Sequence, residues 1–554
     1  MKLIRSPARL LALPLLLLAS FLFMSSSAPD SSLPGFWDAV PHGELAEKIT
    51  SAMTDEELLA QVFMFGWAGS DPTPLVVDWV GRHSLGSIKV FGWNTDNTAK
   101  VAESVCLLQG EAMRGRFRIP LFVATDQEGG WIRHIKGRTS QTPGNLAIGA
   151  SGLPSDSWYS GYYISRELAA LGINLNFAPT VDLYTDHDST VIGPRSFGED
   201  PEAAGILGSA FVSGSRAAGV LTTAKHFPGH GDTGLDSHGR LPEIGISRKT
   251  LYSRELVPFR SLIEAGVPAV MSGHLGFPRI TGNGVPATFS SLFLRDILRG
   301  ELGFDGLVIT DDIMMNGATE YAGSVSTAVQ MASSAGNDIV ESSTTPFSHD
   351  AFWTATLARM KRSADFRERV RESCERVIRV KLAYFKGDNP VPILPDVSRV
   401  DERVPDPEGE RFFLSQAARS VTLIRGELPA VAGGGKSVLI AAAYPEFREA
   451  GKRRFPEAEA VGINDNLYRL ARQSDTIIYC LSDKEDIQVL RNLRGLSRRI
   501  IVVSILSPVL LAEVLWVESA LAVYSYSPHS FTAAFGALAG DYRPGGVLPL
   551  KGLE

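Results

Sequence analysis

One fifteen-residue stretch, KHFPGHGDTGLDSHG at positions 225–239, holds three of the chain's ten histidines together with two aspartates. Its four glycines and its proline make it a poor helix. Imidazole and carboxylate groups this close together can bind a metal ion, move protons or satisfy backbone groups in a turn. A metal site would use five ligands, namely His226, His230, Asp232, Asp236 and His238. Their spacing matches no helical H-x-x-x-H site, so other polar clusters must decide among these uses.

A second cluster closes the apolar run of GLVITDDIMMNGA (306–318). Successive side chains of a strand point to opposite faces, so we expect one of Asp311 and Asp312 to face the end of the sheet and the other to support a loop. A carboxylate at the end of a strand suits a nucleophile or a charge stabiliser, and a buried structural carboxylate is the alternative.

Two further segments, DQEGGWIRH (126–134) and VIGPRSFGEDP (191–201), add acidic residues and Arg195. Carboxylates and a guanidinium provide the directional acceptors and donors that a ligand rich in hydroxyl groups needs. A surface salt bridge is the alternative role for the arginine.

Elements that could position these clusters recur along the chain as eight short apolar runs separated by helix-length segments. The runs are QVFMFGW (61–67), LGSIKVFGWN (85–94), PLFVATDQEGG (120–130), INLNFAPTVD (173–182), VLTTAKH (220–226), PAVMSGH (268–274), DGLVITDD (305–312) and NDIVESS (337–343). Such runs fit parallel strands buried on both faces. We predict a (β/α)₈ TIM-type barrel over 35–386, with amphipathic helices at 200–218 and 247–265. A doubly wound open sheet has the same alternation, and the count of eight favours the barrel.

The polar residues gather at the carboxyl ends of these runs, where barrels place their chemistry. They are Asp126, Asp182, His226, His274 and Asp311.

A second, smaller α/β domain is predicted from 410 to 554. The proline-rich segment 387–409 indicates a linker before it, and a helix is expected at 411–420. Four apolar runs follow, at 436–443, 474–482, 497–506 and 520–527. GGGKS (433–437) resembles a phosphate-binding loop but lacks its first glycine and precedes its strand, so we reject that interpretation.

Composition excludes some classes of function. The net charge of −7 gives no sign of nucleic-acid binding, and three widely spaced cysteines indicate no disulfide framework. The chain begins with Lys2, Arg5 and Arg9, an apolar run and small residues at 25–28, which predicts a signal peptide over 1–28. An uncleaved membrane anchor is the alternative. We therefore expect export to the periplasm, cell surface or medium, with membrane association only through this segment.

Taken together, KHFPGHGDT with DSH, DQEGG, RSFGEDP and TDDIMM resemble glycoside hydrolase family 3, and more narrowly its β-N-acetylhexosaminidase branch, which acts on N-acetylglucosamine. The motifs occur in the family's order between roughly residues 50 and 385. The two-domain layout is similar to Gram-positive members, whose second domain is an α/β sandwich.

The resemblance implies roles for seven residues. Asp311 matches the family's nucleophile, and Asp236 with His238 matches its acid/base dyad. Four residues match those that hold the hydroxyls and acetamide of the sugar: Asp126, Arg195, Lys225 and His226. The family commonly has an arginine eight positions after the aspartate of DQEGG. His134 occupies that position here and Arg133 lies one residue early, which leaves open which of them takes the arginine's place.

The expected function is a retaining, exo-acting β-N-acetylglucosaminidase that trims peptidoglycan fragments or chito-oligosaccharides. Asp311 would attack the anomeric carbon while His238, oriented by Asp236, protonates the leaving oxygen and later deprotonates water. No metal or organic cofactor is needed. The alternatives are a phosphorylase at the same site, attack by the substrate's own acetamide, a metal-dependent hydrolase, and a cell-wall sugar-binding protein without catalysis.

Overall fold

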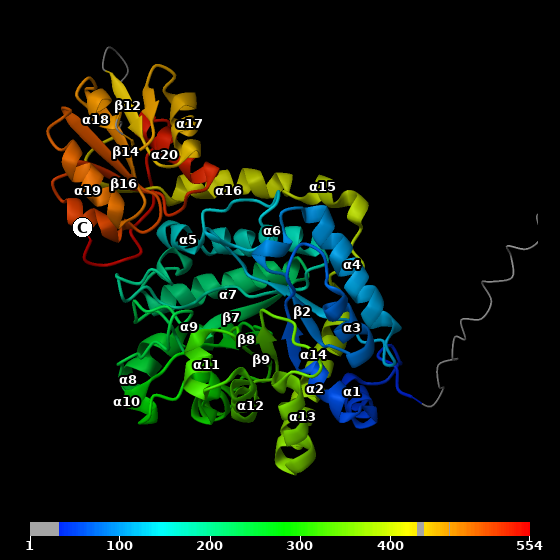
Figure 1. Cartoon of the computed structure of the whole chain (residues 1–554). Coiled ribbons are helices and arrows are strands. Elements are labelled where there is room, and N and C mark those ends of the chain that lie inside the picture. The colour runs from blue at the N-terminus through cyan, green and yellow to red at the C-terminus, as the bar shows by residue number, and fades with distance from the viewer. Residues whose placement is uncertain (1–32, 429–436, 465, 554) are drawn as a thin grey trace, which may run out of the picture.

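A computed structural model describes residues 33–428, 437–464 and 466–553 of the chain. The predicted signal segment 1–28 and most of GGGKS lie outside these ranges. Figure 1 shows two parts, a large barrel and a smaller sheet domain that contains the carboxyl-terminal residues.

Eight parallel strands form the barrel in the order β10-β1-β2-β3-β6-β7-β8-β9. They are β1 (Phe63–Phe65), β2 (Ser87–Lys89), β3 (Phe122–Thr125), β6 (Leu175–Asn176), β7 (Leu221–Phe227), β8 (Ala269–Ser272), β9 (Leu307–Thr310) and β10 (Val340–Ser342). A parallel bridge between Ile309 and Ile339 joins the two edges, so the barrel is nearly closed. Seven strands lie within their predicted runs and β7 extends one residue past its run, to Phe227, which confirms the barrel and rules out the open sheet.

Helices surround the strands (Figure 1). They are α1 (His42–Ala52), α2 (Asp55–Gln61), α3 (Pro74–His83), α4 (Thr98–Arg114), α5 (Asn145–Ser151), α6 (Pro154–Ala170), α7 (Pro201–Ala217), α9 (Leu256–Glu264), α10 (Pro278–Thr281), a π-helical segment (Leu292–Glu301), α11 (Asn316–Ala322), α12 (Val325–Ala335), α13 (Ala351–Arg362) and α14 (Ala364–Phe385). The helix expected at 200–218 is α7, which Asp200 caps by accepting hydrogen bonds from the backbone N–H groups of Glu202 and Ala203.

The helix expected at 247–265 is interrupted. It consists of α8 (Arg248–Thr250), a π-helical turn (Leu251–Glu255) and α9. Pro258 lacks the N–H that would bond to the carbonyl of Arg254, so the ladder of a regular α-helix is broken at this point.

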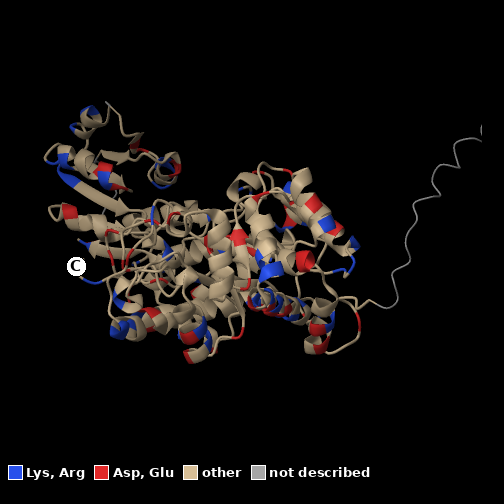
Figure 2. Cartoon of the chain, turned by 60° about the horizontal axis from the view of Figure 1, so that its bottom comes forward, with Lys and Arg blue, Asp and Glu red and all other residues tan. Residues whose placement is uncertain are grey.

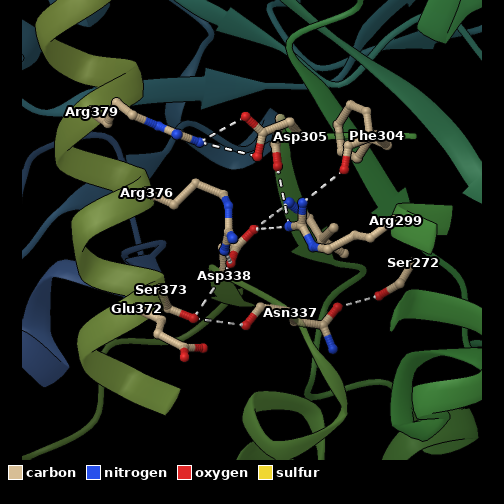
Figure 3. A network of polar contacts seen from close by, with 12 residues as sticks. Ser272, Arg299, Phe304, Asp305, Asn337, Asp338, Glu372, Ser373, Arg376 and Arg379 are labelled. Carbon is tan, nitrogen blue, oxygen red and sulfur yellow. Dashed lines mark hydrogen bonds and ion pairs between the residues drawn. The ribbon is translucent and has the colours of Figure 1, made fainter. Parts of the chain in front are cut away.

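At the amino-terminal end of the barrel, Asp338 binds three arginines, two of which, Arg299 and Arg376, are labelled in Figure 3. Its carboxylate is fully buried and lies 2.6 Å from Arg299, 3.2 Å from Arg369 and 2.7 Å from Arg376. Two of these arginines belong to α14, so the network attaches this last barrel helix to the start of β10. This end of a TIM barrel contributes to stability and not to chemistry.

The second domain is built on one six-stranded sheet, in the order β11-β16-β15-β14-β12-β13. Its strands are β11 (Thr422–Arg425), β12 (Val438–Ala441), β13 (Glu459–Val461), β14 (Thr476–Leu481), β15 (Arg499–Ser504) and β16 (Ser519–Ala522). Its helices are α16 (Pro407–Ser420), α17 (Pro445–Arg454), α18 (Asn466–Ala471), α19 (Lys484–Leu493) and α20 (Pro528–Ala539). The four predicted runs are strands, whereas β11 and β13 were not predicted.

The predicted linker 387–409 is partly helical. It contains α15 (Val400–Arg403), and α16 begins at Pro407 instead of Arg411 because Asp406 caps it and proline is favourable at a first helical position. Helix α16 packs on α5 and α6 of the barrel and on α20 of the second domain.

The two parts share a small hydrophobic cluster. Its buried members are Leu146, Ala147, Ala150, Tyr184, Ala522, Tyr524, Leu550 and Leu553. The final segment also bonds to barrel loops, since the N–H of Glu199 donates to the carbonyl of Pro549 over 3.2 Å and that of Val547 donates to Ala150 over 2.9 Å. A Cβ on Gly198 would lie 2.6 Å from the Pro549 carbonyl oxygen, so only glycine fits there.

Along the ribbon of Figure 2, positions of lysine and arginine are interspersed with positions of aspartate and glutamate. Within the ranges that the structure describes, no helix combines the length and apolar character needed to cross a membrane.

Candidate active site

A polar cavity lies at the carboxyl ends of the barrel strands. Six of the seven predicted site residues line it: Asp126, Arg195, Lys225, His226, His238 and Asp311. The seventh, Asp236, is hydrogen-bonded to His238. A larger cavity of about 480 Å³ opens near the start of β7, but its described lining contains no cluster of carboxylates and histidines. The residues predicted from the sequence motifs therefore belong to one site.

The polar wall of the cavity is a chain of buried ion pairs. The Lys225 ammonium lies 2.6 Å from both Asp126 and Glu128. Glu128 in turn accepts two hydrogen bonds from Arg195, from Nε over 2.9 Å and from Nη2 over 2.7 Å. Burial would raise the pKa of Glu128, but Arg195 and Lys225 outweigh it and lower the pKa to about 2. The wall therefore presents fixed charges, with the guanidinium held in a bidentate geometry.

His226 is oriented by Asp182, which follows β6. Its Nδ1 lies 2.6 Å from Asp182, and Arg195 approaches its Nε2 at 3.4 Å. Nδ1–H therefore donates to the carboxylate, which fixes the orientation of the ring. Asp182 also accepts the backbone N–H groups of His226 and His230.

Asp311 directly follows β9 and lies half-buried on the cavity wall. Burial alone would raise its pKa, but the nearby His226 and His274 outweigh burial, and the pKa falls to about 2. The side chain is therefore a carboxylate near neutral pH, as a nucleophile must be. Asp312 supports the loop, since its Oδ1 accepts the N–H groups of Met314 and Ser343, both over 3.0 Å.

His274 was expected at the same end of the barrel but does not line the cavity. It is fully buried, with Nδ1 3.0 Å from the hydroxyl of Thr288 and Nε2 3.0 Å from the carbonyl of Asp312. Burial lowers its pKa, and its bond to the Asp312 carbonyl makes His274 a support for the segment that follows β9.

The loop after β7 carries the predicted dyad. Asp236 Oδ1 lies 2.7 Å from Nδ1 of His238 and accepts the backbone N–H of the same residue over 2.9 Å. Both side chains are open to solvent, with 74% of His238 and 49% of Asp236 exposed. Gly231 lies against the backbone of a neighbouring segment, since a Cβ there would lie 1.5 Å from the carbonyl oxygen of Leu183. This glycine permits a close backbone contact.

The structure separates the two residues that the sequence left open. Arg133 points away from the cavity and donates to backbone carbonyls of its own loop, including that of Thr139 over 3.2 Å. His134 lines the cavity with Nδ1 3.6 Å from Asp126, and burial lowers its pKa to about 4. A neutral imidazole therefore occupies the position eight residues after the aspartate of DQEGG.

The five residues considered as metal ligands do not converge. His226 is paired with Asp182, Asp232 lies 3.0 Å from Arg254, and Asp236 is paired with His238. Over the described ranges, no three histidines, cysteines or carboxylates are grouped as a metal site would require.

The sequence reasoning missed two buried charged residues at this end of the barrel, Lys89 of β2 and Glu341 of β10, and assigned no role to Glu128. The ammonium of Lys89 lies 3.0 Å from Asp126 and 3.5 Å from Glu341. A charged side chain inside an otherwise apolar strand is itself a signal, since burying a charge is costly unless it is paired.

Comparison with known proteins identifies the family to which this barrel belongs. The chain belongs to glycosyl hydrolase family 3, because residues 54–380 match the N-terminal domain of that family. The resemblance drawn from the motifs is thereby confirmed.

Curated relatives of this chain are named beta-hexosaminidases. Beta-hexosaminidase A of Pseudoalteromonas piscicida is 36% identical over 272 residues, which cover 46% of this chain and 46% of that protein. A beta-hexosaminidase of Pseudomonas aeruginosa (strain LESB58) is 37% identical over 262 residues, or 47% of this chain and 75% of that one. The matched part thus spans about half the length of the first relative.

Solved structures extend the likeness to both domains. A glycoside hydrolase family 3 beta-N-acetylglucosaminidase from Paenibacillus sp. str. FPU-7 superposes with a TM-score of 0.81 at 29% identity, covering 90% of this chain and 99% of that one. A fungal multi-domain GH3 beta-N-acetylglucosaminidase has a TM-score of 0.83 at 28% identity, covering 90% and 61%.

Proposed function

We propose that this protein is a retaining, exo-acting β-N-acetylglucosaminidase that releases terminal N-acetylglucosamine from peptidoglycan fragments or chito-oligosaccharides. The observation that carries the proposal is the shared cavity of Asp311 and His238, an ionised carboxylate and a solvent-facing imidazole. Family membership and the named relatives support the substrate class.

In the first step the carboxylate of Asp311 attacks the anomeric carbon and forms a glycosyl-enzyme ester. The C–O bond to the leaving group breaks, and His238 gives its proton to the departing oxygen. Asp236, 2.7 Å from Nδ1, stabilises the imidazolium and fixes Nε2 as the atom that transfers the proton.

In the second step neutral His238 removes a proton from water, which attacks the anomeric carbon and releases Asp311. Two inversions keep the β configuration. The charged groups of the wall, Asp126, Arg195 and Lys225, bind the hydroxyls and the acetamide of the sugar. His226, which Asp182 orients, contributes to the same contacts.

The experiment that tests the function compares the nitrophenyl β-glycosides of N-acetylglucosamine and glucose, with the product followed by proton NMR. Strong preference for the acetamido sugar with β product first formed is the expected result. Inversion, or equal rates on both glycosides, contradicts the proposal. Faster turnover in phosphate with release of sugar 1-phosphate would show a phosphorylase. Loss of activity with a chelator and its return with Zn²⁺ would show a metal-dependent enzyme.

The site would meet its substrate outside the cytoplasm if the sequence over 1–28 acts as a signal, and we propose export on that basis. Fractionation of cells with detection of the protein by antibody tests this, and recovery of the full-length chain in the cytosol contradicts it.

A further inference from the structure

Lys89, which the proposed mechanism does not use, lies between the barrel core and the cavity. Its side chain is 5% exposed and lines the cavity beside Phe91. The ammonium lies 4.4 Å from the centroid of the Phe91 ring and 5.1 Å from that of Phe177. The ammonium therefore contacts two aromatic rings and two carboxyl groups.

Its main partner is Asp126, a residue that we assign to the sugar. Lys89 Nζ lies 3.0 Å from Oδ2 of Asp126, while Lys225 Nζ lies 2.6 Å from Oδ1. Each carboxylate oxygen therefore has its own ammonium group, one from β2 and one from β7. Two such bonds from different strands fix both the position and the plane of the carboxylate.

The third neighbour of Asp126 cannot replace Lys89. His134 lies 3.6 Å from Oδ2, but burial lowers its pKa to about 4, so it carries no charge near neutral pH. Without Lys89, this oxygen would face only a neutral imidazole at long range.

Glu341 also contacts Lys89 but does not neutralise it. Its carboxyl group is fully buried on β10, and neither oxygen has a hydrogen-bond partner among the described residues. Burial raises its pKa well above the usual range, and the nearby Asp311 and Asp312 act in the same direction despite Lys89. The ammonium of Lys89 lies closer to Asp126, at 3.0 Å, than to Glu341, at 3.5 Å, so it is directed mainly at Asp126.

We propose that Lys89 is a positioning residue for substrate, which fixes the Oδ2 atom of Asp126 so that this carboxylate meets the hydroxyls of the bound sugar. The inference rests on the proposed function. The competing explanation is that Lys89 and Glu341 form a buried pair that only fills the barrel.

A double variant, Lys89→Met with Glu341→Leu, separates these explanations. Apolar residues of similar size often replace a buried ion pair with little loss of stability, so the double variant should fold with a melting temperature close to that of the wild type. If Lys89 positions Asp126, kcat/KM for the N-acetylglucosaminide should fall about 10- to 100-fold, the loss expected for one charge-assisted hydrogen bond, mainly through KM. The single variant Lys89→Arg should lose less kcat/KM than the double variant, because it keeps a cation at this position.

The matched control is Lys381→Met. Lys381 is a buried lysine of α14 whose ammonium lies 2.6 Å from the carbonyl of Gly86 and 3.2 Å from Gln61, away from the cavity. This variant should lower the melting temperature and leave KM as it is.

A folded double variant with the KM and kcat of the wild type overturns the proposal. Should the double variant not fold, Lys89→Gln answers the same question, since an unchanged KM in that folded variant also overturns the proposal. A folded wild type that fails to cleave the N-acetylglucosaminide refutes the proposed function instead, and this is seen before any variant is measured.

Discussion

His238 and Asp236 are hydrogen-bonded to each other, Nδ1 to Oδ1 over 2.7 Å, on a loop that leaves both side chains largely open to solvent. The pair is thus assembled in the free protein. Ser237 between them accepts the N–H of Gly317 over 3.0 Å, and this backbone bond attaches the loop to α11. The catalytic roles of the pair remain predictions that kinetics can test.

Replacing His238 by alanine should slow hydrolysis in a way that depends on the leaving group. A general acid contributes about 10²- to 10⁴-fold when the departing oxygen is basic, and far less when it is a nitrophenolate. Turnover of chitobiose and of the nitrophenyl glycoside should be measured side by side. Equal losses on both would contradict an acid role.

Replacing Asp311 by asparagine should lower kcat by more than about a thousandfold, because the variant cannot form the ester. Since the pKa of Asp311 is lowered to about 2, the carboxylate stays ionised throughout the usual assay range, and an acid limb of kcat/KM above about pH 4 must come from another group. A fluorosugar that traps the intermediate should label Asp311 in mass spectrometry. Near-normal turnover by the asparagine variant, or label on another residue, would refute this assignment.

Replacing Asp338 by alanine should destabilise the barrel strongly, because three arginines would lose the buried carboxylate shown in Figure 3. Removing one side of a buried ion network costs about 3–5 kcal/mol in the free energy of unfolding. The matched control is Asp305→Ala, in the same view, whose carboxylate is 78% exposed and pairs with Arg379. An exposed pair contributes roughly 0–1 kcal/mol, so similar losses in urea unfolding of the two variants would contradict the prediction.

Glu167 should make stability depend on pH. This residue of α6 is buried, and burial raises its pKa to about 7 even though Ser140 donates to it. Between the usual carboxyl pKa and about 7 the folded protein holds a proton that the unfolded chain releases, so stability should fall as the pH rises through this interval. Glu167→Gln should remove that part of the slope of melting temperature against pH. Parallel slopes in the two proteins would show that Glu167 is ionised in the fold.

The barrel could be predicted because each of its strands coincides with a short, mostly apolar run, and the runs are separated by helix-length segments. Strand β13 was missed because two of its three residues are exposed, so it has no apolar pattern to detect. Strand β11 was missed because it is a short edge strand, antiparallel to β16, with only one buried residue. The start of α16 was misplaced because the prolines around Asp406 were interpreted as linker, whereas Asp406 caps the helix and Pro407 is its first residue.

The site was predicted through its motifs, whereas the residues that were missed or left open depend on strand pairing and side-chain direction. Lys89 and Glu341 are single ionisable residues inside barrel strands, and only the pairing of strands that are distant in sequence places β10 near β2 and β3. Arg133 and His134 could not be separated from sequence, because one step along a strand reverses the face to which a side chain points.

The last residues of the second domain also support the barrel loop that carries Arg195. The Pro549 carbonyl holds the N–H of Glu199 and packs against Gly198, three positions beyond Arg195. Shortening the chain by even its last ten residues would therefore expose that turn to water and loosen the guanidinium. A barrel expressed on its own would lose sugar affinity before it lost its helices.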